Sequence, residues 1–533
     1  MDARHAASGR AAAESAPDDV GTDAAARRGR RPPGRLSVVA VVLAALALVA
    51  AGDCRLPLSA TRPAGDSAAA AESPRRANPA ASPRAPLPRA ARLDPLLEAL
   101  EARTFQWFWD TADPATGLVP DRWPTRNFSS VAAIGFGLAS YTIGAERGYV
   151  TRAAAAARTR TTLEYLLNLP QGPQSTGVAG YKGFFYHFLK FSDGTRFASD
   201  VELSTIDTAL LVAGALAAKE YFDGDAADER AIGVAADALY GRVEWGWARP
   251  RPPLVSMGWT PENGFHPLDW KGYNEGMILY ILALGSPTHA IAGDAWTTYT
   301  ATYDWAPFQG YEMVNFGPLF GHQYSHVFVD FRGIRDGYMQ GKGIDYFENS
   351  RRAVYSQRAY AIANPGNFKG YGADLWGLTA CDGPNDGAHP DVDGNVRSFM
   401  TYGARAAAAN ELRDDGTIAP TAAAGSLPFA PEIVLPALRS MVRRGTAGAF
   451  TRYGFVDAFN LTYGPADPPA MGRYVAGVGW FDTDYLGIDQ GPIVAMIENH
   501  RSGLLWSLCR RDAYIVAGLR RAGFSGGWLD AAP

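Results

Sequence analysis

Twelve stretches with apolar residues at three- and four-residue spacing follow one another from about Leu93 onward. This spacing places apolar side chains on one helix face, as with Leu96, Leu100 and Phe108. Strand-like alternation is scarce, and a superhelical solenoid, the main rival, would call for a repeat of fixed period that we do not find. We therefore predict an all-α fold, an (α/α)6 barrel: a toroid of six helical hairpins with long aromatic-rich loops. The predicted helices are 94–111, 131–147, 151–167, 205–221, 226–245, 274–284, 294–303, 350–362, 396–410, 431–444, 492–500 and 504–522.

Residues at the expected helix starts support some of these limits. Asp294 and Ser350 are typical N-caps, because a short side-chain oxygen can accept from the first free backbone N–H groups. Pro431 and Pro492 suit first turns, where a missing N–H costs nothing.

The N-terminal 91 residues differ in composition from the rest. A basic tail and the apolar run 36–51 make residues 1–54 an expected export signal. An uncleaved membrane anchor, or a lipid anchor at Cys54, are the alternatives. Residues 55–91 are mostly Ala, Pro, Ser and Arg, which predicts a disordered linker. Residues 92–533 are expected to form the enzyme domain. We expect a periplasmic or secreted protein whose membrane association, if any, uses this N-terminal segment alone.

Charge bears on the binding partners, and cysteine content bears on disulfide bonding. The net charge is −4 and the folded part has no basic stripe, which argues against a nucleic-acid partner. Cys381 and Cys509 leave two possibilities open, a disulfide or buried free thiols.

The segment 311–340 combines seven aromatic residues with two His, three carboxylates and two Arg. Such a mixture is costly to bury as plain core, because each charge then needs a partner. It is better suited to the wall of a cleft in which aromatic faces pack on sugar rings and polar groups bind hydroxyls.

Three segments place carboxylates next to aromatic residues and glycine. Glu275 opens an apolar helix beside Tyr273, a setting that raises a carboxyl pKa as a general acid requires. Glu202 and Asp207 precede or begin the helix 205–221, and Asp457 and Asp489 follow later. Helix capping and dipole compensation are competing interpretations for each of them. Glycosidases need two such groups, and the sequence offers more than two candidates.

Metal and cofactor signatures are weak. His322 and His326 have helical ligand spacing, but the residues between them do not complete a zinc motif. We find no P-loop, dinucleotide or GxSxG pattern in the sequence. We therefore expect neither a metal nor a cofactor.

Several ordered motifs resemble the glucoamylase-like domain family of bacterial proteins, which includes glycoside hydrolase family 144 and relatives acting on β-1,2-glucan. They are GFFYHFL at 183–189, ELSTIDTALL at 202–211, YNEGMILYILALGSPTH at 273–289, NFGPLFGHQYSHVFVDFRGIRD at 315–336, APTAAAGSLPFAPE at 419–432, YGFVDAFN at 453–460 and LGIDQGPIVAMIENHRSGLLW at 486–506. The resemblance implies an (α/α)6 barrel and an exported, cofactor-free enzyme that cleaves β-linked glucan.

The resemblance also implies residue roles. Glu275 would be the general acid, and Asp207 would line the cleft near the cleaved bond. Asp457 would be the base, acting through a substrate hydroxyl and water, with Asp489 as the runner-up. The expected substrate-binding residues are Glu202, Tyr186, His187, Trp270, Tyr273, His322, Tyr324, His326, Arg332, Arg335, Asp336 and Trp376.

Two other functions remain open at this point. A non-catalytic envelope glycan-binding protein would keep the aromatic residues and lose the acid, which disfavours it here. The other is a different carbohydrate enzyme on the same barrel, such as a phosphorylase or a lyase. A lyase would need a basic subsite, for which Arg332, Arg335 and His326 are available. The favoured function is hydrolysis of β-linked glucan by carboxylate acid–base catalysis, with β-1,2-linked glucan as the expected substrate.

Overall fold

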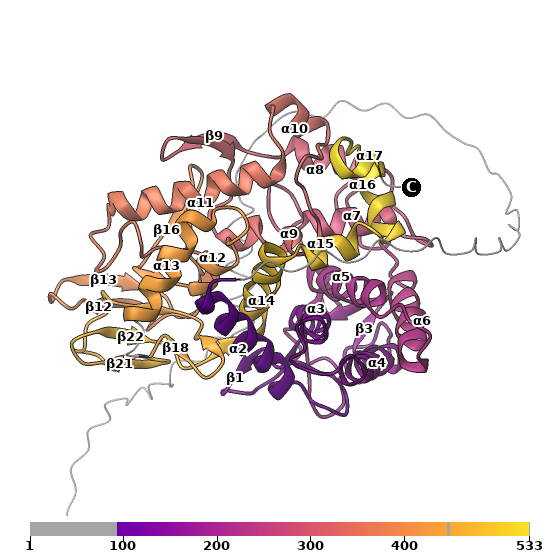
Figure 1. Ribbon diagram of the computed structural model, residues 1–533, viewed down its shortest axis with the longest axis horizontal. Helices are drawn as coiled ribbons and strands as arrows, with labels where there is room; N and C mark the ends of the chain where they lie inside the picture. The colour runs from indigo at the N-terminus through magenta and orange to yellow at the C-terminus, as the bar shows by residue number, and fades with distance from the viewer. Residues whose placement is uncertain (1–92, 445–447, 532–533) are drawn as a thin grey trace, which may run out of the picture. The chain divides into compact units, whose positions relative to one another are not determined.

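The computed structural model describes residues 93–444 and 448–531 (Figure 1). The predicted signal or anchor at 1–54 and the linker at 55–91 lie outside the described residues. Within the described part, no helix has the length and apolar character needed to cross a membrane.

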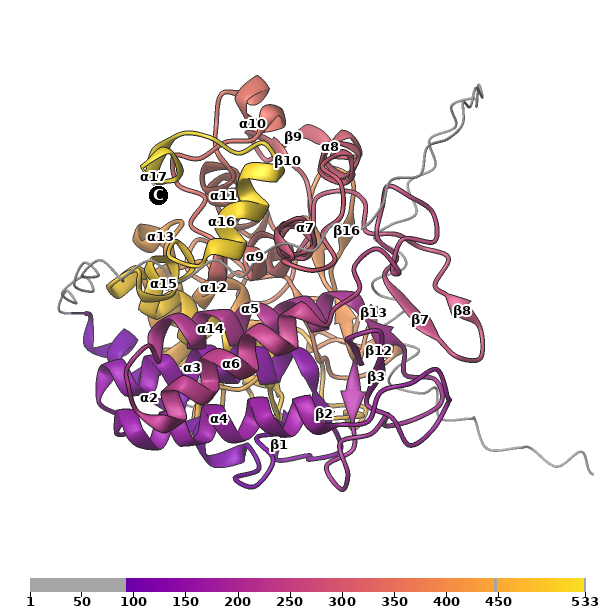
Figure 2. The same ribbon diagram turned by 90° about the vertical axis from the view of Figure 1, so that its right-hand side faces the viewer.

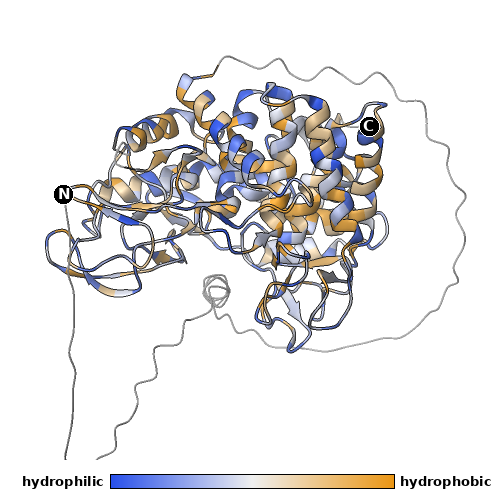
Figure 3. Ribbon diagram, turned by 90° about the horizontal axis from the view of Figure 1, so that it is seen from below, coloured by the Kyte–Doolittle hydropathy of each residue, from blue (hydrophilic) through white to orange (hydrophobic). Residues whose placement is uncertain are grey.

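Helices account for the main framework of this part. In chain order they are α2 (Pro95–Thr111), α3 (Val131–Arg147), α4 (Arg152–Asn168), α5 (Thr205–Tyr221), α6 (Ala227–Gly241), α7 (Met277–Gly285), α8 (Asp294–Ala301), the 3-10 helix η1 (Leu319–His322), α9 (Tyr324–Phe328), α10 (Gly337–Lys342), α11 (Tyr346–Ala363), α12 (Pro420–Ala424), α13 (Pro431–Arg444), α14 (Gly487–Arg501), α15 (Leu504–Cys509), α16 (Ala513–Arg521) and α17 (Gly527–Asp530). Figure 3 shows hydrophobic residues along these helices and more hydrophilic residues at several helix ends and in the loops.

The inner helices form a barrel-like arrangement. Helices α14, α3, α5, α7 and α9 pack one against the next, and α12 packs against α14. Helices α2, α4, α6, α13 and α16 pack outside them, and Figure 2 shows α4 and α6 alongside α3 and α5. Because the inner helices are buried on nearly all sides, their sequences are apolar around the whole circumference, as in α7.

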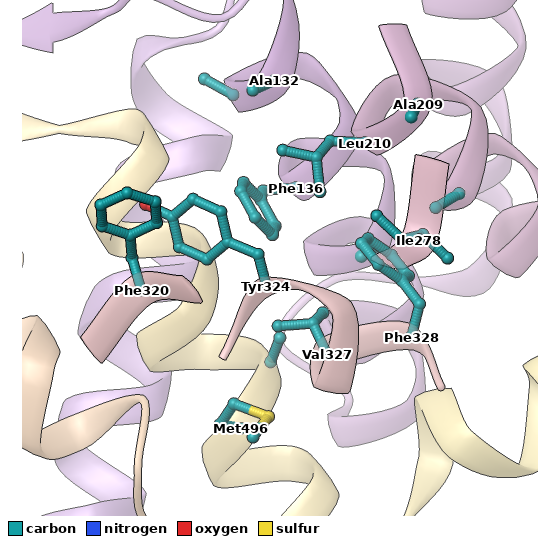
Figure 4. Close-up of a cluster of buried hydrophobic side chains, with 14 of the residues drawn as sticks. Ala132, Phe136, Ala209, Leu210, Ile278, Phe320, Tyr324, Val327, Phe328 and Met496 are labelled. Atoms are coloured by element: carbon teal, nitrogen blue, oxygen red, sulfur yellow. The ribbon is translucent and has the colours of Figure 1, made fainter. Parts of the chain in front are cut away.

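Side chains from the inner helices fill the middle of this arrangement (Figure 4). Phe136 of α3, Leu210 of α5, Ile278 of α7, Phe328 of α9 and Met496 of α14 point toward one another there. All five are almost completely buried. The centre is therefore a packed core, and an open site must lie toward one end of the helices.

Helices α3 and α5 approach each other more closely than ordinary side chains allow. A Cβ atom added at Gly214 would lie 2.1 Å from the carbonyl oxygen of Gly135, and one added at Gly135 would lie 2.4 Å from that of Leu210. Glycine is required at both positions because the backbones themselves are in contact. This approach brings the N-terminal ends of the two helices together.

Short strands form many of the connections, so the predicted all-α class is only partly correct. Nearly all pairs are antiparallel, in a five-stranded sheet of order β3-β4-β6-β7-β8, a four-stranded sheet of order β17-β20-β22-β21 and several two-stranded pairs. The strands are β1 (Arg122–Trp123), β2 (Ser129–Ser130), β3 (Gly180–Tyr181), β4 (Phe184–Tyr186), β5 (Phe188–Leu189), β6 (Leu203–Ser204), β7 (Gly258–Thr260), β8 (Gly264–Phe265), β9 (Trp305–Phe308), β10 (Tyr311–Val314), β11 (Ala380–Cys381), β12 (Gly387–Pro390), β13 (Val396–Phe399), β14 (Gly403–Ala404), β15 (Ala406–Ala407), β16 (Leu412–Arg413), β17 (Thr417–Ile418), β18 (Phe450–Thr451), β19 (Gly454–Phe455), β20 (Phe459–Asn460), β21 (Arg473–Val475), β22 (Gly479–Phe481) and β23 (Tyr485–Leu486).

One predicted helix is wrong and others differ at their ends. The segment 396–410 was predicted as a helix but forms β13, β14 and β15. Buried Arg405 of this segment donates to Asp415 and to the backbone carbonyl of Cys381, and these contacts favour the extended backbone over a helix. The segment 504–522 is two helices, because Asp512 caps a new one. Gly293 rather than Asp294 is the N-cap of α8.

Two further helix starts were also predicted too late. The N-cap of α11 is Asp345 rather than Ser350, and the side chain of Asp345 accepts from the backbone N–H of Glu348. Pro492 lies inside α14, which begins at Gly487. Of the two possibilities for the cysteines, the structure has buried free thiols at Cys381 and Cys509.

Candidate active site

A pocket of about 900 Å³, its open mouth included, lies at the N-terminal ends of several inner helices. Ser130 caps α3, Asp207 lies in the first turn of α5, Glu275 lies two residues before α7, and Ile488 belongs to the first turn of α14. Helix N-termini carry partial positive charge, which favours carboxylates at this end. The full lining is Asp121, Arg122, Phe128, Ser130, His187, Phe188, Ile206, Asp207, Leu210, Glu275, Phe320, Tyr324, Ala380, Tyr402, Ala404, Leu486 and Ile488.

Glu275 supplies a carboxyl group that prefers to keep its proton. The predicted helix began at 274, but α7 begins at Met277, so Glu275 lies in a turn two residues before it. The side chain of Glu275 is buried. Burial, with a smaller contribution from the charge of Asp207, raises the pKa of Glu275 to about 8. Its backbone carbonyl accepts from Ser325 Oγ at 2.9 Å, which anchors the turn to α9. A carboxyl group in this state can donate a proton at neutral pH.

His187 lies between two carboxylates on the pocket wall. Its Nδ1 is 2.8 Å from Oε1 of Glu202, and its Nε2 is 3.4 Å from Oδ1 of Asp207. Burial acts to lower the pKa of His187, but the charges of Asp207 and Glu202 outweigh it and raise the pKa to about 9. At neutral pH this group is therefore an imidazolium with a carboxylate on each side. Ser204 Oγ donates to the other Asp207 oxygen and so fixes its orientation.

Asp121 and Arg122 were missed by the sequence analysis and line the pocket. Arg122 Nε donates to Asp121 Oδ2 at 3.3 Å, and its Nη1 donates to Asp382 Oδ2 at 2.8 Å. A donor and an acceptor side by side match two neighbouring hydroxyls of a sugar ring. The signal in the sequence was an acid–base pair a few residues before the Ser130 cap, and such pairs are too common in loops to single out.

Asp457 and Asp489, the predicted base and its runner-up, are buried beside each other but do not belong to the pocket lining. Burial, and then the neighbouring charge of Asp489, raises the pKa of Asp457 well above its usual range. Asp457 Oδ2 accepts from the backbone N–H of Asp382 at 2.7 Å. Arg122, which pairs with Asp382, connects this group to the pocket wall.

The structure brings four of the predicted residues to the pocket, namely Glu275, Asp207, His187 and Tyr324, with Glu202 directly behind His187. Others are core or surface groups: for example, Asp336 caps α10 and accepts from Trp296 and Tyr346. Besides Glu202, Asp457 and Asp489, the predicted residues outside the lining are Tyr186, Trp270, Tyr273, His322, His326, Arg332, Arg335, Asp336 and Trp376.

His322 and His326 show why spacing alone misleads. They lie on η1 and α9, which the sequence analysis had not predicted as helical, and both are fully buried. Burial lowers the pKa of His322 to about 3 and that of His326 well below its usual range, so both are neutral. Their rings pack on Tyr273 and Phe331, respectively.

Comparison with known proteins places the chain in a family. The family model described as "Putative glucoamylase" matches residues 267–513. A solved structure from Bacteroides uniformis, also described as a putative glucoamylase, is 33% identical, covers 82% of this chain and 100% of its own, and has a TM-score of 0.70. The chain belongs to this glucoamylase-like family.

Two other members of the family carry names that state an activity. An endo-β-1,2-glucanase from Chitinophaga pinensis, solved with sophorotriose and glucose, is 31% identical, with 81% of this chain and 98% of that chain covered and a TM-score of 0.68. An exo β-1,2-glucooligosaccharide sophorohydrolase from Parabacteroides distasonis is 29% identical over 461 residues, 80% of this chain. This chain spans 57% of the length of that curated relative.

Proposed function

We propose that this protein is a glycoside hydrolase that cleaves β-1,2-linked glucan. The observation that carries the proposal is Glu275, a carboxyl group with a pKa of about 8 on the wall of a pocket lined by two other carboxylates. The names of the endo-acting and exo-acting relatives support β-1,2-linked glucose chains as the substrate.

In the proposed reaction, protonated Glu275 donates its proton to the glycosidic oxygen as the bond to the anomeric carbon breaks. Positive charge that develops on the sugar is stabilised by the carboxylate of Asp207; burial raises the pKa of Asp207, and the charge of His187 opposes that rise and favours the ionised form. Asp121 and Arg122 bind neighbouring hydroxyls, and Phe320 and Tyr324 offer aromatic faces to a ring. Water then attacks the anomeric carbon and loses its proton to a base.

Two carboxylates compete for the role of base. Asp457 is the sequence prediction, and from behind the pocket wall it would act through a substrate hydroxyl and a water molecule. Asp121 is the structural candidate, because its side chain lines the pocket that would hold the substrate. Replacing each with asparagine tests the assignment, since the true base cannot be replaced by an amide without loss of turnover.

The finer fold class and the location belong to the same proposal. We infer an (α/α)6 barrel, supported by an inner series of α3, α5, α7, α9, α12 and α14 with further helices packed outside it. We also infer export to the periplasm or the outside, based on the basic and apolar segments of residues 1–54, with 92–533 as the enzyme domain.

The deciding experiment is incubation of the purified protein with linear and cyclic β-1,2-glucan, the β-1,3, β-1,4 and β-1,6 glucans, and starch. We expect new reducing ends from β-1,2-glucan, and the product sizes then distinguish endo from exo action. Cleavage of another linkage alone would overturn the substrate. Binding without turnover would favour a glycan-binding protein, and an unsaturated product with ultraviolet absorbance would identify a lyase.

A further inference from the structure

Three aspartates from separate segments meet behind the pocket wall. Asp382 follows β11, Asp457 lies between β19 and β20, and Asp482 follows β22. One carboxylate oxygen from each lies within 4.8 Å of those of the other two. Backbone hydrogen bonds hold the three segments together, including Asp382 N to Asp457 Oδ2 at 2.7 Å and Asp482 N to Ala458 O at 2.9 Å.

Each of these side chains leaves one buried oxygen without a hydrogen-bond donor. All three aspartates are at most 2% exposed. Within residues 93–444 and 448–531, no donor reaches Oδ1 of Asp382, Oδ1 of Asp457 or Oδ2 of Asp482. The opposite oxygens are satisfied, for example Asp482 Oδ1 by the backbone N–H of Thr483 at 2.6 Å. Buried acceptors that lack a donor are rare in native proteins and require an explanation.

A hydrogen bond between the carboxyl groups of Asp457 and Asp489 can satisfy Asp457, but the nearby groups leave the free oxygens of Asp382 and Asp482 unexplained. In the part of the chain that the structure describes, Arg122 is the cation that forms ion pairs with this group, at 2.8 Å to Asp382 and 3.8 Å to Asp484. Asp489 and Asp121 add further negative charge beside it. The next guanidinium, Arg405, is already bound by both oxygens of Asp415. Burial and the neighbouring carboxylates raise the pKa values of Asp457 and Asp482 well above their usual range.

We propose that Asp382, Asp457 and Asp482 bind one hard divalent cation, with Ca²⁺ as the preferred ion. Each of the three residues offers a carboxylate oxygen, the donor type that selects Ca²⁺, Mg²⁺ or Mn²⁺ over softer metals. Ca²⁺–oxygen distances of about 2.4 Å allow two ligands of one ion to lie at most ~4.8 Å apart, and the observed spacing satisfies that limit. The remaining coordination positions are left for water.

The cation would stabilise the loops behind the substrate pocket. It would join the segments after β11, between β19 and β20, and after β22. The ion pair between Asp382 and Arg122 would then hold Arg122 in place on the pocket wall. It would also decide the identity of the base. A cation on the unpaired Oδ1 of Asp457 would leave that residue no oxygen for a proton, because its Oδ2 already accepts from Asp382 N, and Asp121 would then take that role.

Metal binding is testable without substrate, so its outcome is independent of the proposed hydrolase activity. The full chain is purified, treated with EDTA, dialysed and titrated with CaCl2, with MgCl2 and MnCl2 in parallel. We expect one bound ion per chain by calorimetry and elemental analysis. At free Ca²⁺ about 100-fold above Kd, we expect Tm to rise by roughly 3 °C over the EDTA-treated protein.

The decisive variant is Asp482→Asn, with Asp484→Asn as the matched control two residues away. We expect Asp482→Asn to lose stoichiometric Ca²⁺ binding and the Ca²⁺-dependent Tm rise, and Asp484→Asn to keep both. If protons rather than a cation neutralise the cluster, asparagine mimics the protonated carboxyl and Asp482→Asn keeps the Tm of the EDTA-treated protein. Absence of Ca²⁺, Mg²⁺ and Mn²⁺ binding to the folded unsubstituted chain, or unchanged Ca²⁺ binding in Asp482→Asn, would overturn the proposal.

Discussion

Replacing Glu275 with glutamine removes the proposed proton donor while keeping its size and shape. With a pKa of about 8, about nine-tenths of the Glu275 side chains are protonated at pH 7. General acid catalysis contributes about 10²–10⁴ in rate, so we expect kcat to fall about 10³-fold, equivalent to about 4 kcal/mol of transition-state stabilisation. The assay is reducing-end release from linear β-1,2-glucan at saturating substrate.

A substrate with an aryl leaving group makes this test sharper, because such a group departs without protonation. We expect Glu275→Gln to recover most of its rate on an aryl β-glucoside of the same chain length. Glu411→Gln, a partly buried glutamate outside the pocket, is the matched control and should keep the kcat of the unsubstituted protein. Near-normal kcat of Glu275→Gln on β-1,2-glucan would remove Glu275 from the acid role.

The same carboxyl group predicts two pH effects. Because the acid must be protonated, kcat should fall about tenfold per unit as pH rises above about 8. The folded-state pKa is raised above the unfolded value, so the stability it contributes is complete below about pH 4.5 and is lost as pH rises through 8. Glu275→Gln does not ionise, so it should match the unsubstituted protein in Tm at pH 4.5 and exceed it by a few degrees at pH 9. Equal Tm values at pH 9 would contradict the buried, protonated state.

Three further predictions concern other parts of the site and fold. Asp121→Asn should lower kcat at least 10²-fold and keep Ca²⁺ binding, whereas Asp457→Asn should lower kcat and also lose Ca²⁺ binding. Measuring kcat and Ca²⁺ stoichiometry on both variants distinguishes a base from a metal ligand. His187→Gln removes the cation that opposes the burial-raised pKa of Asp207, so kcat/KM should fall about 10–100-fold, with the largest loss at acidic pH. A uniform loss across the pH profile would contradict this role. Gly214→Ala adds a Cβ atom 2.1 Å from the carbonyl oxygen of Gly135 and should cost about 3 kcal/mol or more in urea unfolding, which an unchanged midpoint would disprove.

Local sequence patterns were sufficient to predict the ends of a helix that begins with its own capping residue. Both ends of α3 and α5 agree with the prediction, because a mostly apolar run follows a serine that caps the first turn. Glu275 was also identifiable, since a lone acid between aromatic residues and an apolar helix has few ways to avoid burial. These features depend on residues within a few positions of one another along the chain.

Contacts between distant segments were beyond the sequence patterns. Arg405 turned a predicted helix into strands by binding Asp415 and backbone carbonyls, which no local periodicity reveals. Arg122 pairs with Asp382, 260 positions away, and so brings Asp121 to the pocket.

The sequence by itself therefore determined the helical framework and the candidate acid, because helix periodicity, capping and side-chain chemistry act over short chain distances. Only the tertiary structure decided which carboxylates share the pocket and which cluster behind it. The physical reason is that burial and the fields of neighbouring charges set the state of a carboxyl group, and both arise when loops remote in sequence, such as those carrying Asp382, Asp457 and Asp482, are packed together.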